Sequence, residues 1–219
     1  MSKESAQQQT AKERAYNKIR DAILAGQFKP GEQLKEEQLC DFCDVSRTPV
    51  RQALRRLAEE GTVTTRENRR SYVTDLTRSE LEEAFDVACF LESYSAGLAA
   101  ERATAEQIAE LEALADKMEK INFSSPSDYR QFLEFNGQFH QVIHSISGNR
   151  HIAELIRRIP DAANTVFLKT SNLKDIAHTN TEHRELISAI ASGDSEFAKL
   201  KMTMHIESVR RSMRSLLSE

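Results

Sequence analysis

Two arginines in the first third of the chain have the spacing that places both on one side of a helix. Arg47 and Arg51 are four residues apart, so a helix through them presents their guanidinium groups on a common face. A guanidinium can donate paired hydrogen bonds to O6 and N7 of guanine, or it can clamp a phosphate. Ser46 and Thr48 carry hydroxyls suited to phosphates or base edges. The cluster predicts contact with DNA, although any one of these arginines alone is more typical of a solvated helix surface.

The residues around this cluster predict three helices. Apolar side chains recur at helical spacing in three segments: 10–25, 35–43 and 46–60. Gly26 and Gly61 end the first and third segments, because glycine readily adopts the geometry of a helix terminus. Ser46 is a suitable N-cap, and Pro49 lies in the first turn, where its missing N–H costs little. The two arginines therefore belong to the N-terminal part of the third helix.

A short β-hairpin is predicted to follow these helices. Residues 62–65 and 71–74 are β-prone, and they flank a charged tip at 66–70. Three helices followed by a hairpin form a winged helix-turn-helix. In that motif a helix reads base edges in the major groove with its N-terminal residues.

The chain after the hairpin has no β-strand signal. Thr77 and Glu80 form a capping box that opens a long helix. Helices are predicted over six segments: 77–102, 104–121, 127–147, 149–170, 174–192 and 195–217. Pro160 is predicted to kink or divide the fourth of them. The predicted fold class is mainly α, with a winged helix-turn-helix domain at 1–75 and an all-helical bundle at 76–219.

Charge is distributed unevenly along the chain, whose net charge is −4. Residues 1–75 carry 14 Lys and Arg against 12 Asp and Glu, whereas residues 76–219 carry 16 against 22. A basic patch at 47–70, with seven Arg against three Glu, suits a site-specific DNA binder. No apolar run approaches the roughly 18 residues of a membrane span, and the N-terminus lacks a signal peptide's apolar core. We therefore expect a cytoplasmic protein without membrane contact.

The cysteines offer a weaker chemical signal. Cys40 and Cys43 have the C-x-x-C spacing of zinc or redox sites, but a second pair is missing and Cys89 stands alone. Both members of the pair lie inside a helical pattern. We interpret them as small, partly buried helix residues, and we expect no disulfide in a cytoplasmic protein.

Residues 10–74 contain three motifs in a fixed order: GQFKPGEQL at 26–34, VSRTPVRQALRRL at 45–57 and EG at 60–61. This order closely resembles the GntR family of bacterial repressors. The resemblance implies that the recognition helix enters the major groove and that the wing tip reaches the minor groove. It assigns DNA contacts to Ser46, Arg47, Thr48, Arg51, Arg69 and Arg70.

Two positions depart from that family's pattern. Asp44 replaces the usual Gly at the turn between the helices, and Asp tolerates left-handed geometry better than most residues. Arg70 replaces the usual Gly at the wing tip. Either it adds a positive charge for the minor groove, or the wing has another shape.

The second half carries scattered matched positions: Leu91, Glu92, Ala96, Leu98, Ala99, Ala100, Asn136, Phe139, His140, Gly148, Asn149, Glu182, His183, Leu186, Ala189, Ile190, Gly193, Asp194 and His205. The pattern is similar to the ligand-binding bundle of the FadR-type branch, known as FCD. The resemblance implies a domain that binds a small-molecule effector, with six helices.

Four of these positions imply a metal site: Asn136, His140, His183 and His205. Asn136 and His140 share a helix face, and neutral imidazoles are the commonest ligands for zinc and nickel, the ions that we expect. Resembling domains often have Asp where this chain has Asn136, so we expect weaker binding and a more electrophilic ion. His144 lies one turn after His140 and is a possible further ligand. His151 and His178 are predicted to be surface residues, and ordinary structural histidines remain the alternative for the whole set.

The effector is not evident from the sequence. Many resembling domains have an Arg four residues before the position of Glu92, where it helps to bind a carboxylate, but this chain has Ala88. An organic acid would need the metal or another donor, for which Tyr94, Arg130 and Arg157 are candidates.

Three functions follow from these observations. The first is a ligand-responsive repressor, not an enzyme, that binds a pseudo-palindromic operator in double-stranded DNA as a homodimer and holds an organic acid at a divalent metal. The second is a regulator that binds an acyl-CoA or no ligand and has structural histidines. The third is a helical metallohydrolase with a zinc ion at His140, His183 and His205. The chain has no H-E-x-x-H motif and no evident general base, which argues against this third function.

Overall fold

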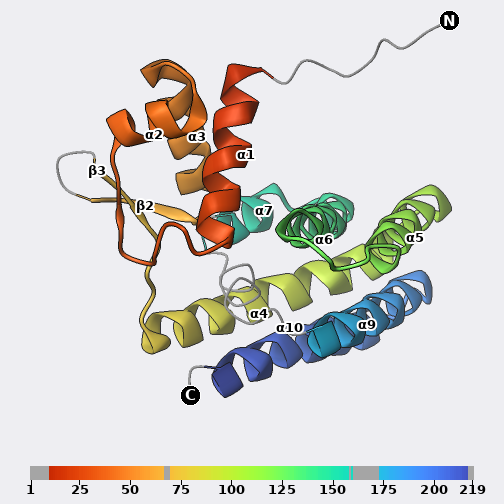
Figure 1. Cartoon of the computed structure of the whole chain (residues 1–219). Helices are drawn as coiled ribbons and strands as arrows, with labels where there is room; N and C mark the ends of the chain where they lie inside the picture. Colours follow the sequence, from red (N-terminus) through yellow and green to blue (C-terminus); the bar gives the residue numbers. More distant parts are fainter. Residues whose placement is uncertain (1–9, 67–69, 158, 160–172, 217–219) are drawn as a thin grey trace, which may run out of the picture. The chain divides into compact units, whose positions relative to one another are not determined.

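The computed structural model describes residues 10–66, 70–157, 159 and 173–216. It divides into two compact units, Met1–Asp75 and Leu76–Glu219 (Figure 1). The first contains three helices and a small sheet, and the described part of the second is entirely helical. The predicted fold class is confirmed. Among the described helices, none combines the length and the apolar character that a membrane span requires.

The first unit has the three predicted helices: α1 (Ala11–Leu24), α2 (Glu36–Cys43) and α3 (Arg47–Glu59). A capping box between Thr10 and Glu13 starts α1. The core consists of the apolar faces of these helices and the adjoining strands: Ala15, Tyr16, Ile19, Ile23, Leu34, Leu39, Cys43, Val50, Ala53, Leu54, Leu57, Val63 and Val73. Cys43 is buried, Cys40 is half-buried and both are free thiols, as interpreted from the sequence.

The connection between α2 and α3 depends on Asp44, which adopts the left-handed conformation with φ 54° and ψ 53°. The predicted tolerance of Asp at this position is confirmed. Ser46 occupies the N-cap position of α3, but its side chain makes no capping hydrogen bond. Its hydroxyl is exposed.

The sheet contains the predicted hairpin, β2 (Val63–Arg66) and β3 (Arg70–Val73), and a strand that the sequence did not predict. β1 (Gln33–Leu34) pairs antiparallel with β3, and the strand order is β1-β3-β2. A strand of two residues is too short to show the alternating pattern by which strands are predicted. It forms because β3 offers a partner for its backbone. The tip at 67–69, with Arg69, lies outside the described residues.

The described part of the second unit has six helices: α4 (Arg78–Arg102), α5 (Ala105–Glu119), α6 (Pro126–Ser147), α7 (Arg150–Ile156), α9 (Leu173–Ala191) and α10 (Ser195–Leu216). The predicted capping box between Thr77 and Glu80 starts α4. The helix predicted over 149–170 is interrupted, because α7 ends at Ile156 with Arg157 as its C-cap. Pro160, the predicted point of division, and residues 161–170 lie outside the described residues.

Two contacts fix α10 along α4. A Cβ on Gly97 would lie 2.6 Å from Cε of Lys199, so the absence of a side chain allows the two helices to approach closely. At the other end, Arg210 is nearly buried and donates to Glu82 at 2.7 Å and to Asp86 at 2.6 Å. These contacts set the rotation of α10 and thereby the direction in which its histidine points.

Candidate metal centre and nucleic-acid interface

Three histidines from three helices converge inside the second unit. His140 comes from α6, His183 from α9 and His205 from α10, and their potential ligand atoms all lie within 4.8 Å of one another. His183 is fully buried, His205 is 3% exposed and the side chain of His140 is 13% exposed. The structure therefore brings together the three histidines that the family resemblance implied.

Several buried polar atoms on the helices that carry these histidines have no hydrogen-bond partner among the described residues. Both ring nitrogens of His183 are buried without a partner, and so is Oδ1 of Asn136. Asn136 lies one turn before His140 on α6, on the same helix face. Leaving a buried polar atom unsatisfied costs about 1–3 kcal/mol, so such atoms need an explanation, and a bound ion is one.

Carboxylates orient two of the three imidazoles. Glu182 Oε2 lies 3.0 Å from Nδ1 of His205, and Glu92 Oε2 lies 3.2 Å from Nδ1 of His140. When each Nδ1 donates its proton to the carboxylate, the lone pair of Nε2 is left for a metal ion. These roles of Glu92 and Glu182 were not predicted from the sequence, although both glutamates stand at positions matched in the family resemblance.

His144 faces Glu92 as well. Its Nε2 lies 2.8 Å from the same oxygen, Oε2, that accepts from His140. Burial alone would raise the pKa of Glu92, but the two imidazoles outweigh it and hold the pKa below its usual range. Glu92, His140 and His144 form a second group whose atoms are close enough to hold an ion. Since each nitrogen already has a carboxylate partner, we interpret this group as a hydrogen-bonded support for His140.

The protonation states of the buried histidines suit metal binding. Burial lowers the pKa of His183 well below its usual value, and the neighbouring His205 and His140 lower it further. Burial also lowers the pKa of His205, against the opposing effect of the hydrogen bond to Glu182. Both rings are therefore neutral at neutral pH, which is the form that binds metal.

The donor set fits a divalent transition metal. A tetrahedral ion about 2.0–2.2 Å from each ligand holds its ligands about 3.3–3.6 Å apart. The three histidine donors lie within 4.8 Å of one another, so side-chain rotations that close the cluster by about 1 Å bring them into range. Imidazole and carbonyl donors are suitable for zinc and nickel.

Of the remaining histidines and the effector candidates, His151, Tyr94 and Arg157 have described side chains, and all three are exposed. His151 is exposed, as predicted, and the side chain of His178 lies outside the described residues. Tyr94 is 44% exposed, and it is two residues from Glu92, so it points to the opposite side of α4. Arg157 is exposed and donates to the carbonyl of Ala153, and the side chain of Arg130 lies outside the described residues. None of these candidates is therefore seen at the histidine cluster.

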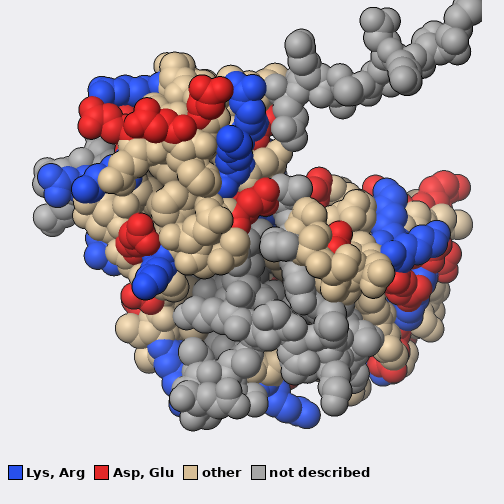
Figure 2. Space-filling view, in the orientation of Figure 1, with Lys and Arg blue, Asp and Glu red and all other residues tan. Residues whose placement is uncertain are grey.

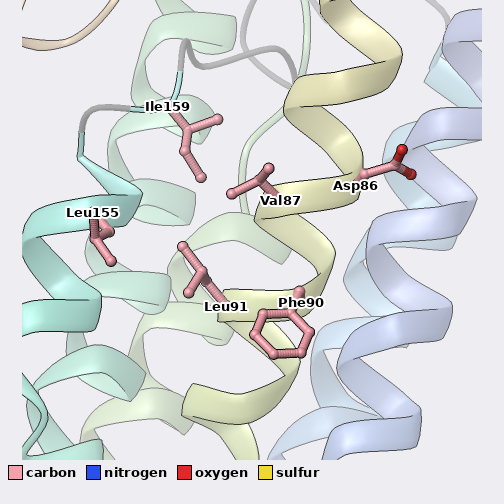
Figure 3. A pocket seen from close by; sticks show the side chains of 6 residues that line it. All are labelled: Asp86, Val87, Phe90, Leu91, Leu155 and Ile159. Carbon is pink, nitrogen blue, oxygen red and sulfur yellow. The ribbon is translucent and has the colours of Figure 1, made fainter.

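A separate cavity of about 450 Å³ opens between α4 and the C-terminal end of α7. Its lining is apolar apart from Asp86: Val87, Phe90, Leu91, Leu155 and Ile159. Figure 3 shows Asp86 pointing away from the others toward α10, where it pairs with Arg210. Among the described lining residues, the cavity thus has no side-chain donor for a carboxylate.

The predicted DNA-contacting residues of α3 are exposed together. Ser46, Arg47, Thr48 and Arg51 all face solvent at the start of the helix. The opposite face of α3 is buried in the core through Val50, Ala53, Leu54 and Leu57. On the wing, Arg66 and Arg70 are paired in register and exposed, and basic side chains gather there in Figure 2.

Both arginines of α3 are paired with acids of α2, which the sequence did not predict. Arg47 Nη2 lies 2.7 Å from Glu37 Oε1, and Arg51 Nε lies 2.9 Å from Glu36 Oε1. All four side chains are solvent-accessible, so these pairs add little to stability. They do orient the guanidinium groups, and they place two negative charges beside the surface that would meet DNA.

Two family models match the chain. The model described as "Bacterial regulatory proteins, gntR family" matches residues 11–73, and the one described as "FCD domain" matches residues 83–208. The chain is 27% identical over 207 residues to the HTH-type transcriptional regulator YdhC of Bacillus subtilis, covering 93% of this chain and 91% of the relative. It is 25% identical over 213 residues to the HTH-type transcriptional repressor RspR of Escherichia coli, covering 96% and 92%. The solved structure of E. coli McbR/YncC has the same fold, with a TM-score of 0.73 at 20% identity over 94% of this chain and 98% of that one.

Proposed function

This chain belongs to the GntR family of bacterial regulators, in the FadR-type branch with an FCD domain, and on that premise we propose that it is a metal-dependent, effector-controlled repressor. The observation that carries the proposal is the convergence of His140 and His205 on His183, whose two ring nitrogens have no partner among the described residues. The relatives reported above are named as transcription regulators, which supports a role in DNA binding rather than catalysis.

The DNA-binding part of the proposal uses the start of α3 and the wing. Ser46, Arg47, Thr48 and Arg51 would contact the major groove, and Arg70, with Arg69, would reach the minor groove. A single small winged head buries too little surface for tight specific binding, so two heads of a homodimer would read the half-sites of a pseudo-palindrome. The repressor named among the relatives supports repression as the mode of control.

The effector part uses the second unit. His140, His183 and His205 would hold a divalent ion, with Asn136 as a fourth and weaker ligand. The ion would supply a positive charge and open coordination positions for the oxygens of a small organic acid. Effector binding would shift the population of conformers and so change the fit of the two heads to their half-sites. A purely structural role for the histidines is less well supported, because buried structural histidines normally have hydrogen-bond partners.

The test compares metal content and operator binding in the same preparations. We expect one zinc or nickel ion per chain by elemental analysis, and we expect small carboxylic acids to weaken a gel-shifted operator complex only when the metal is bound. His183→Gln should lose the ion, whereas His151→Gln, which changes an exposed histidine, should keep it. A metal-free native protein with unchanged operator control would contradict the proposal.

A further inference from the structure

The proposed ligand set poses a question of charge. Asn136, His140, His183 and His205 are all neutral as metal ligands, so before an effector binds none of these four balances the ion's two positive charges. A buried charge without compensation is costly, and it is retained only where opposite charges or aligned hydrogen bonds offset that cost. The neutral set therefore requires negative charge close by.

Two carboxylates lie one imidazole away from the proposed ion. Glu92 is 6% exposed, and its Oε2 is 3.2 Å from Nδ1 of His140. Glu182 has an Oε2 at 3.0 Å from Nδ1 of His205, and its side chain is 12% exposed. Two negative charges are thus hydrogen-bonded to the far sides of two ligands and are largely shielded from water.

We infer that Glu92 and Glu182 act as positioning residues that balance the charge of the metal ion through His140 and His205, so that a neutral Asn136 suffices as the fourth ligand. This inference depends on the metal site of the proposed function. A carboxylate behind an imidazole polarises the ring and makes Nε2 a better donor. His144 completes the arrangement, because its Nε2 lies 2.8 Å from Glu92 and holds that carboxylate toward His140.

Asn136 gains an explanation from this balance. An aspartate there, together with Glu92 and Glu182, would give three negative charges around a dication. With asparagine at position 136, the two negative charges of Glu92 and Glu182 equal the two positive charges of the ion. The expectation of a more electrophilic ion, drawn from the asparagine alone, is therefore replaced by that of an ion neutralised through its imidazoles.

Conservative substitutions separate this role from simple packing. Glu92→Gln and Glu182→Gln keep the size of the side chain and an oxygen that can accept from Nδ1, and they remove only the charge. Each should weaken zinc binding by about 10–100-fold in competition with a chelating dye. The melting temperature should fall more for the zinc-bound protein than for the metal-free protein, because the charge that is removed balances the ion. Glu185→Gln is the matched control, since Glu185 is on the same helix as Glu182 and pairs with Lys201 instead.

A double-mutant cycle tests the charge balance itself. Asn136→Asp should improve zinc affinity by a larger factor in the Glu92→Gln background than in the parent, because the added charge replaces the lost one. Equal factors would show that Glu92 does not act through its charge and would overturn the inference. Parent-like zinc affinity in both Gln variants would also overturn it, and so would a loss confined to metal-free stability. A parent protein that binds no zinc would instead reject the proposed function on which the inference depends.

Metal stoichiometry provides a further check. Glu92, His140 and His144 are close enough to hold an ion themselves. One zinc per chain, lost on His183→Gln, supports the positioning role of Glu92. Two zinc ions per chain, one of them lost on His144→Gln, would make Glu92 a direct ligand and would contradict it.

Discussion

Arg51 donates from Nε to both carboxylate oxygens of Glu36, each at 2.9 Å, so that α3 is tied to α2 at the surface proposed to meet DNA. Arg47 also pairs with α2, donating from Nη2 to a single oxygen of Glu37 at 2.7 Å. Since all four side chains are solvent-accessible, the pairs can open at little cost. An incoming phosphate or guanine would have to replace a glutamate as the partner of each arginine, and that competition can be measured.

Removing one of these acids should strengthen DNA binding. Glu36→Gln frees Arg51 and deletes a negative charge close to the DNA phosphates, so operator affinity should rise several-fold in a gel shift at fixed salt. Glu59→Gln is the control, because Glu59 pairs with Arg55 at the other end of α3. Weaker binding by Glu36→Gln would mean that the pair orients Arg51 for base recognition.

If α3 contacts the bases, a single substitution in it should cause a large loss of operator affinity. Arg47→Ala should cost about 1–3 kcal/mol of operator binding and relax the base preference at one position in each half-site. Lys12→Ala, at an exposed position at the start of α1, should change neither. Titrations against operators altered at each position would measure both effects, and a uniform loss across all sequences would indicate a phosphate contact.

The proposed homodimer predicts the mass of the particle. One chain has a mass of 24.8 kDa, and sedimentation at micromolar concentration should give twice that value. The operator complex should contain two chains for each duplex with both half-sites. If the protein had the mass of one chain both free and on DNA, a homodimer that binds the two half-sites of a pseudo-palindrome would be excluded.

Metal binding should stabilise the second unit by mass action. At a free zinc concentration of about 100 times the dissociation constant, the folded state should gain about 2.7 kcal/mol. Chelation should reverse the gain, and His205→Gln should abolish it. His151→Gln should retain the full shift in a thermal unfolding experiment, and a similar loss in both variants would indicate non-specific binding of zinc.

The first unit should become less stable at high pH because of one tyrosine. Burial, with the hydrogen bond from Tyr16 to Glu60 at 2.8 Å, raises the pKa of Tyr16 to about 12. The protonated form is favoured in the fold, so its contribution is complete below about pH 10, the ordinary pKa of tyrosine. It is then lost as the pH rises toward 12. Tyr16→Phe should lower the free energy of unfolding at pH 7 by about 1.5–3 kcal/mol. It should also flatten the pH dependence above pH 10, and urea unfolding at several pH values would measure both.

Local signals in the sequence were enough to predict most helices and their ends. The capping box of Thr77 and Glu80, the tolerance of Asp44 for left-handed geometry and the end of α3 before Gly61 all depend on atoms within one helical turn. Such effects act between near neighbours in the chain, so they can be read directly from the order of residues. The shared helix face of Asn136 and His140 could be predicted in the same way, from their spacing of four residues.

Only the tertiary structure decided which distant residues meet. His183 and His205 reach His140 because α9 and α10 take particular rotations, and the close approach at Gly97 and the pairing of Arg210 determine that of α10. The partners Glu92 and Glu36 and the strand β1 likewise depend on contacts between separate elements. The sequence determined the helices, their ends and the residue types available for chemistry. The packing of one element on another determined which of those residues share a site, because such contacts arise from the shape of whole surfaces and leave no periodic signal along the chain.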